Sequence, residues 1–149
     1  FAREDCKRWS ISFRDNSQWH TISMKTDENN PEDWYRSAKV RLGSADRLYP
    51  LEGTSESVIE LLQESAERYL KGYLISKGWA LSRIHDLGAL IAEAQRYDGR
   101  FGEFADFADE LTDQFWAMHY PGGEFDEQSL DFHEVRTRLD GMLNLIAGR

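Results

Sequence analysis

The chain has 149 residues, of which 40% are hydrophobic, and its formal net charge at pH 7 is −9. This length suits one domain with a sizeable core. No apolar run is long enough for a membrane span, and the single cysteine, Cys6, excludes an intramolecular disulfide and a zinc cluster built from cysteines. The acidity argues against a protein that coats nucleic acid non-specifically. We expect a cytoplasmic location, because nothing in the composition points to export.

The charge is unevenly distributed along the chain. Acids and bases balance in residues 1–30, so the whole net charge lies in residues 31–149. Residues 101–135 contain ten acids and no Lys or Arg, whereas residues 68–100 contain six bases and three acids. These segments are either ordinary solvated helix faces, or an anionic ligand is attracted to residues 68–100 and repelled by residues 101–135.

Residues 1–30 differ in character from the rest of the chain. They are polar and weakly periodic, and a short apolar alternation at residues 11–13 is their main strand signal. We therefore expect an irregular N-terminal extension. Met24 precedes a polar stretch and a clear helix start, so one hypothesis is that residues 1–23 are not native. The intact mass of the native protein tests that hypothesis.

The first predicted helix starts at a strong N-terminal signal. Asn30 is a favourable N-cap residue, and Pro31 suits the first helical position, where its missing N–H is not needed. We expect Pro50 and Gly53 to end this helix.

Four further helices are predicted from apolar residues at helical spacing. The second, from Thr54 or Ser55 to about Ser76, has the widest apolar face and is expected to be central. The expected ranges of the others are 86–97, 101–119 and 127–147. Loops of about four to eight residues favour antiparallel neighbours. The sequence thus predicts an all-α domain over residues 31–149, an antiparallel up-and-down bundle of about five helices.

Familiar short motifs of enzyme sites are missing from the sequence. It contains no P-loop, no dinucleotide-binding fingerprint and no nucleophile elbow. The four histidines are scattered, and no two of them stand four residues apart as zinc ligands on a helix do. We therefore expect neither a metal site nor a cofactor.

Four stretches, taken in order, resemble a known family. They are Asp33-Trp34-Tyr35 with Ala38, the run from Gln63 to Lys71, His85-Asp86-Leu87 with Leu90, and His119-Tyr120-Pro121. This ordered set on a short helical chain is similar to the HEPN domain family (higher eukaryotes and prokaryotes nucleotide-binding). The resemblance covers roughly residues 31–147.

The resemblance implies a helical bundle that is commonly a homodimer. Some members of the family are encoded beside a small nucleotidyltransferase and act in toxin–antitoxin or defence systems. Others are metal-independent ribonucleases with an Arg-x(4–6)-His motif, and others bind nucleotides. This chain departs from the ribonuclease pattern, because residues 112–115 before His119 include no arginine. The one match to the motif, from Arg14 to His20, lies in the extension.

Three hypotheses for the function follow. The first is binding of a nucleotide, of a small nucleotidyltransferase partner, or of both, within a prokaryotic toxin–antitoxin or defence pair. The second is an atypical toxin ribonuclease that uses His85 or His119 on RNA. The third is a structural dimerisation module. Whether the chain is an enzyme stays open, because the arginine of the ribonuclease motif is missing.

Lys71, His85 and Asp86 are candidates for contact with a nucleotide phosphate. Lys71 either binds the phosphate or forms a surface pair with Glu67, four residues earlier on the helix. Asp86 either belongs to a polar pair facing a groove or caps the third helix. His85 either binds a phosphate or carries a proton, which makes it a candidate catalytic residue, or packs at the helix entry.

His119 and Tyr120 are the other candidates. His119 either replaces the arginine of the family's motif, as a catalytic or phosphate-binding residue, or complements the negative end of a helix dipole. Tyr120 either contacts the ligand, or is a modification target for a nucleotidyltransferase, or is a core ring.

Overall fold

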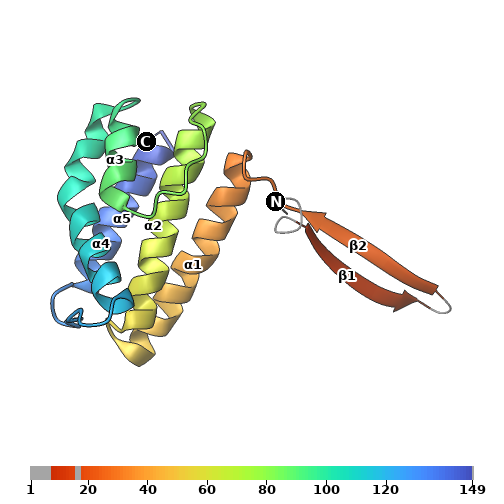
Figure 1. Ribbon diagram of the computed structural model, residues 1–149, viewed down its shortest axis with the longest axis horizontal. Helices are drawn as coiled ribbons and strands as arrows, with labels where there is room; N and C mark the ends of the chain where they lie inside the picture. The colour runs from red at the N-terminus through yellow and green to blue at the C-terminus, as the bar shows by residue number, and fades with distance from the viewer. Residues whose placement is uncertain (1–7, 16–17, 149) are drawn as a thin grey trace.

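A helical bundle and a β-hairpin make up the computed structural model, which describes residues 8–15 and 18–148 (Figure 1). Strands β1 (Arg8–Asp15) and β2 (Gln18–Lys25) are antiparallel, and their register places Ile11 opposite Ile22. The hairpin extends away from the bundle (Figure 1).

The expectation of an irregular extension is therefore wrong for the described part of residues 1–30. The alternation at residues 11–13 is part of a longer two-residue period that starts at Trp9. The register places Trp9 opposite Met24 and Phe13 opposite His20. A period of two residues suits an extended strand, whose successive residues point to opposite faces.

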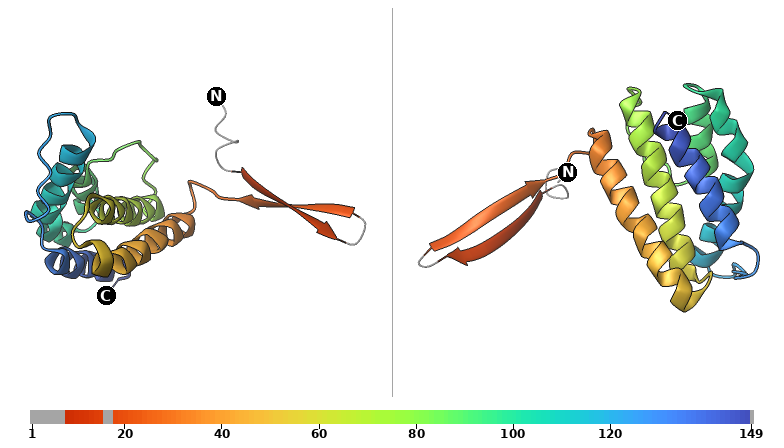
Figure 2. Two further views of the ribbon diagram at one scale, coloured as in Figure 1. Left: turned by 90° about the horizontal axis from the view of Figure 1, so that it is seen from below. Right: turned by 180° about the vertical axis from the view of Figure 1, so that it is seen from behind.

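The all-α bundle predicted for the rest of the chain is confirmed. Its elements are α1 (Pro31–Glu52), α2 (Glu56–Ser76), α3 (Leu87–Gln95), the 3₁₀ helix η2 (Gly99–Phe104), α4 (Ala105–His119) and α5 (Phe132–Ile146). Helix α2 is central and contacts each of the other four α-helices (Figure 2). Among the described residues, no helix combines the length and apolar character that crossing a membrane requires.

Polar side chains define the beginnings of four α-helices. The side chains of Asn30, Ser55 and Asp86 accept backbone N–H bonds at the starts of α1, α2 and α3, as their positions in the sequence predict. Asp131 caps α5 in the same way by accepting from His133 N at 2.9 Å. These caps satisfy amide groups that have no partner inside the helix.

Helix α1 continues past Pro50, which was expected to end it. The helix runs to Glu52, and Gly53 follows as its C-cap with a positive φ of 66°. A proline in the last turn removes only its own backbone bond. The bond from Gly53 N to Tyr49 O, at 2.8 Å, still closes the turn.

The fourth helix starts later than predicted because a 3₁₀ helix precedes it. Residues in a 3₁₀ helix eclipse every third position, so Phe101 and Phe104 lie on one face of η2, and both are buried. Asp98 initiates this tighter turn by accepting from Arg100 N at 3.0 Å.

The fifth helix begins at Phe132 rather than near Glu127. Asp126 Oδ1 accepts from Gln128 N at 2.9 Å, and Ser129 N donates to Asp126 O at 3.1 Å. Such local bonds compete with helix formation and hold the segment in turns. The connection 120–131 is consequently longer than the expected loops. The connection 77–86 is also longer than expected.

The core lies between α2 and the surrounding helices. Leu62, Leu70 and Leu74 of α2 are almost fully buried, together with Leu90 of α3 and Leu111 of α4. Close contact between α1 and α2 depends on Gly72. A Cβ at Gly72 would lie 2.6 Å from Tyr35 Cε1, so α1 approaches α2 at a point where α2 has no side chain.

Candidate functional site

Polar residues form a continuous stripe on the central helix. Gln63, Glu64, Glu67, Arg68 and Lys71 recur at intervals of three and four residues, which places them on one side of α2. We call these five residues the α2 polar stripe. The connection 77–86 returns along one edge of it, and α1 covers the other edge (Figure 1).

At the first edge, the stripe holds His85 at two points. His85 Nδ1 lies 3.1 Å from Glu67 Oε1, and Gln63 Nε2 donates to the backbone oxygen of His85 at 3.0 Å. The His85 side chain is nevertheless 59% exposed. Its main chain and one ring nitrogen are thus fixed while the rest of the ring faces solvent.

Lys71 lies inside the protein. Its Nζ donates to Glu67 Oε1 at 2.7 Å and stands 5.7 Å from the centre of the Trp34 ring. The side chain is only 5% exposed, and that of Glu67 is 12% exposed. The pair with Glu67 foreseen from the four-residue spacing is present, but it is buried rather than at the surface.

At the second edge of the stripe, two arginines contact the same carboxylate, that of Glu64. Arg41 Nε donates to Glu64 Oε2 at 2.6 Å, and Arg68 Nη1 lies 3.4 Å from the same oxygen. Arg41 also donates to Ser37 Oγ at 3.0 Å. Burial, and then repulsion from Arg41, lower the pKa of Arg68, while Glu64 opposes that shift.

A small cavity lies beside the arginine edge. Its volume is about 200 Å³, and its lining combines Trp34, Ser37 and Arg68 with Thr26 and the acidic Asp27, Glu28 and Asp33. The ring of Trp34 therefore joins the two halves of the stripe, since it contacts this cavity and faces Lys71.

Asp86 acts as a helix cap in this structure. Its Oδ1 accepts from Ala89 N at 3.1 Å at the start of α3. This is the structural role that its position predicts, and it also anchors the residue next to His85.

His119 and Tyr120 lie at the C-terminal end of α4. His119 Nε2 is 3.6 Å from Glu60 Oε1, and its ring is 4.3 Å from that of Phe115. Tyr120 is 62% exposed, so the interpretation of this residue as a core ring is wrong. The helix ends here because Pro121 cannot continue it.

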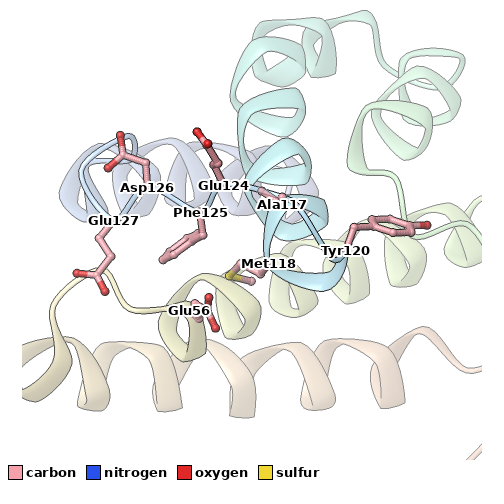
Figure 3. A pocket seen from close by; sticks show the side chains of 9 residues that line it. Glu56, Ala117, Met118, Tyr120, Glu124, Phe125, Asp126 and Glu127 are labelled. Carbon is pink, nitrogen blue, oxygen red and sulfur yellow. The ribbon is translucent and has the colours of Figure 1, made fainter.

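Tyr120 borders a wide acidic cavity of about 730 Å³. Glu56, Glu124, Asp126 and Glu127 line it, and the ring of Tyr120 points away from these carboxylates (Figure 3). Carboxylates at such density repel a phosphate. This cavity is thus unfavourable for a phosphate.

Potential metal ligands are not gathered in the structure. Across residues 8–15 and 18–148, no three His, Cys, Asp or Glu residues are grouped so that they could hold a metal ion.

A comparison with protein families decides the identity of the fold. The family model for the HEPN domain matches residues 31–145. The chain belongs to the HEPN domain family. No curated protein and no solved structure gave a significant match. The functions of HEPN domains often involve nucleotides or RNA, and these domains often dimerise.

The HEPN family match confirms the resemblance drawn from the four motif stretches. The structure brings part of the second stretch and the third into one site, because Gln63 and Glu67 both contact His85. In the fourth stretch, the charged partner of His119 is Glu60 of α2 rather than an arginine. Arg14 and His20 lie in the hairpin, outside the matched residues.

Sequence reasoning missed the contribution of Arg41 and Gln63 to this HEPN site. The Glu64–Arg68 spacing predicts a helix pair, but Arg41 reaches Glu64 from another helix, 23 residues away in sequence. Gln63 was visible only as part of a motif stretch, and its bond to the His85 backbone spans 22 residues.

Proposed function

We propose that this HEPN domain binds a nucleotide through its phosphate at the α2 polar stripe. The observation that carries the proposal is a local surplus of positive charge. The guanidinium groups of Arg41 and Arg68 share the single carboxylate of Glu64, in a chain whose net charge is −9. A phosphate gains from such a surplus and from the partly desolvated surroundings of the arginines.

The exposed groups at the two edges are the ones that can meet the phosphate. His85 is exposed, and Arg68 lines a cavity beside Trp34. Lys71 is buried and bound to Glu67, so it does not meet the phosphate directly. Asp86 keeps its role as a cap.

Calorimetric titration with AMP, ATP and GTP tests this proposal. We expect heat of binding for at least one nucleotide, weakened roughly tenfold or more in Arg68→Ala, because a hydrogen bond to a charged group contributes about 1.5–3 kcal/mol. Arg96→Ala is the matched control, since Arg96 is 75% exposed and pairs with Glu93 in a separate helix. Absence of heat for the wild type at millimolar nucleotide would contradict the proposal.

A second candidate is ribonuclease activity, favoured by the contact between Glu67 and His85. A carboxylate that holds one ring nitrogen leaves the other available for proton transfer, as general acid–base catalysis on RNA requires. RNA incubated with the wild type, His85→Ala and His119→Ala separates the possibilities. Cleavage that is lost only in His85→Ala supports the activity at the stripe, and uncleaved RNA with the wild type refutes it.

We also propose a cytoplasmic homodimer that pairs with a small nucleotidyltransferase in a prokaryotic toxin–antitoxin or defence system. The frequent dimerisation of HEPN domains supports the dimer, and the exposure of Tyr120 makes this side chain accessible to a modifying partner. Light scattering that shows a monomer at tens of micromolar would contradict the dimer. A dimer that binds neither nucleotide nor partner would favour the structural dimerisation module.

A further inference from the structure

His85 is attached to α2 through both its backbone and its side chain. Gln63, which is fully buried, donates to its backbone oxygen at 3.0 Å, and Glu67 Oε1 lies 3.1 Å from its Nδ1. The restraint fixes the position of residue 85 along α2 and the direction in which its ring turns.

The carboxylate of Glu67 is itself restrained. Lys71 Nζ donates to the same oxygen, Oε1, at 2.7 Å, and the aromatic face of Trp34 lies on the far side of the ammonium. Lys71 balances the charge of the carboxylate inside the protein and determines which of its oxygens faces His85. A buried carboxylate without such a partner would be costly.

The hydrogen bond between Glu67 and His85 determines the tautomer of the His85 ring. A carboxylate only accepts hydrogen bonds, so the Nδ1 that faces Glu67 must carry the proton of the neutral ring. The lone pair then lies on Nε2. Since the ring is exposed, Nε2 is the nitrogen that a ligand in solution can reach.

We propose that Glu67, whose charge Lys71 balances, is a positioning residue that presents His85 Nε2 to the phosphate of the bound nucleotide. The ligand class is a phosphate monoester. Nε2 accepts the proton of the monoanionic phosphate, and the Nε2–H of the resulting imidazolium then donates a hydrogen bond to the dianion, while Nδ1–H stays bonded to Glu67. This inference rests on the proposed function, because it names the group that meets the ligand at that site.

Long-range ¹H–¹⁵N NMR of the full chain, labelled at histidine and free of ligand, tests the positioning. For the neutral ring, we expect the Nδ1–H tautomer of His85. In the double variant Glu67→Leu with Lys71→Met, which removes both charges and keeps side-chain volume, we expect a shift towards the Nε2–H tautomer that an unconstrained histidine side chain favours. Lys71→Met alone retains the carboxylate and should retain the Nδ1–H form. His133 in the same spectra is the internal control, because it lies on α5 and contacts the rings of Tyr49 and Phe132.

A wild-type His85 in the Nε2–H form, or a double variant that keeps the Nδ1–H form, would overturn the inference. AMP is then added to the same samples, and the expected result is a shift of the His85 Nε2 resonance with weaker binding in the double variant. AMP binding to a wild type with the wrong tautomer refutes the positioning and leaves the proposed function intact. The expected tautomer without AMP binding refutes the assignment of a phosphate monoester as the ligand. If ATP and GTP also give no heat of binding, the proposed function is refuted as well.

Discussion

At the scale of single residues, the position of Lys71 is the least expected feature of this HEPN domain. Lysine is almost never buried unless it is paired. Here the ammonium has a carboxylate at 2.7 Å and an aromatic face at 5.7 Å. Desolvation of the two charges opposes their attraction, so the pair contributes less to stability than its short distance implies.

Removing only one member of the pair should therefore be costly. We expect Lys71→Met to lower the free energy of unfolding by about 2–3 kcal/mol, because Glu67 stays buried with only His85 as a partner. The double variant Glu67→Leu with Lys71→Met should lie within about 1 kcal/mol of the wild type. Urea unfolding measures both. Arg96→Met, which removes an exposed pair, is the control and should change the free energy of unfolding by less than about 0.5 kcal/mol. If Lys71→Met costs no more than that, the Lys71–Glu67 pair is not a desolvated one.

At the scale of helices, the packing of α1 on α2 determines which side chains reach the stripe. Tyr35 and Tyr69 stack across this contact with ring centres 6.2 Å apart, and Ser65 Oγ donates to the backbone oxygen of Ala38 at 2.9 Å. The same contact brings Arg41 to Glu64. The missing side chain at Gly72 makes this close approach possible.

Two helix glycines should therefore respond oppositely to alanine. In Gly72→Ala the new methyl would lie 2.6 Å from Tyr35 Cε1, and we expect a net loss of about 1–2 kcal/mol despite the better helix propensity of alanine. In Gly43→Ala the nearest atom is the mobile end of Arg47 at 3.2 Å, and we expect a gain of about 0.5–1 kcal/mol. Urea or thermal unfolding of the two variants gives the comparison. Equal effects of the same sign would show that α1 does not pack tightly at Gly72.

At the scale of the whole molecule, buried tyrosines link stability to alkaline pH. Tyr35 and Tyr69 lie half-buried between α1 and α2, and Tyr73 is buried with its ring centre 4.7 Å from that of Phe101. Burial raises the pKa of all three phenols. The folded state therefore holds these protons to higher pH than the unfolded state does.

The sign of the resulting pH dependence follows. The contribution to stability is complete below the ordinary tyrosine pKa of about 10 and is lost as the pH rises through the higher pKa of the folded state. We expect the urea midpoint to fall with pH above about 10. Tyr73→Phe removes one of these phenols, so its midpoint should fall less steeply. A wild-type midpoint that is constant over this range, or an unchanged slope in Tyr73→Phe, would contradict the prediction.

Much of the fold is readable from the sequence because it depends on local spacing. The caps Asn30, Ser55 and Asp86, the central position of α2 and the Glu67–Lys71 pair all follow from neighbours within one helical turn or from one apolar face. The ends of helices do not follow from spacing alone where local turns compete with the helix, as the turn at Asp126 does before α5.

The sequence by itself determined the helical class, the family and the residues worth testing. Only the tertiary structure decided how those residues combine. His85 meets Glu67 across 18 residues and Arg41 meets Glu64 across 23, and such contacts depend on which helices are neighbours and how each is rotated. Spacing along one helix carries no information about that arrangement. For the same reason, only packing against α1 could reveal that Lys71 is internal and that His85 is the exposed end of its network.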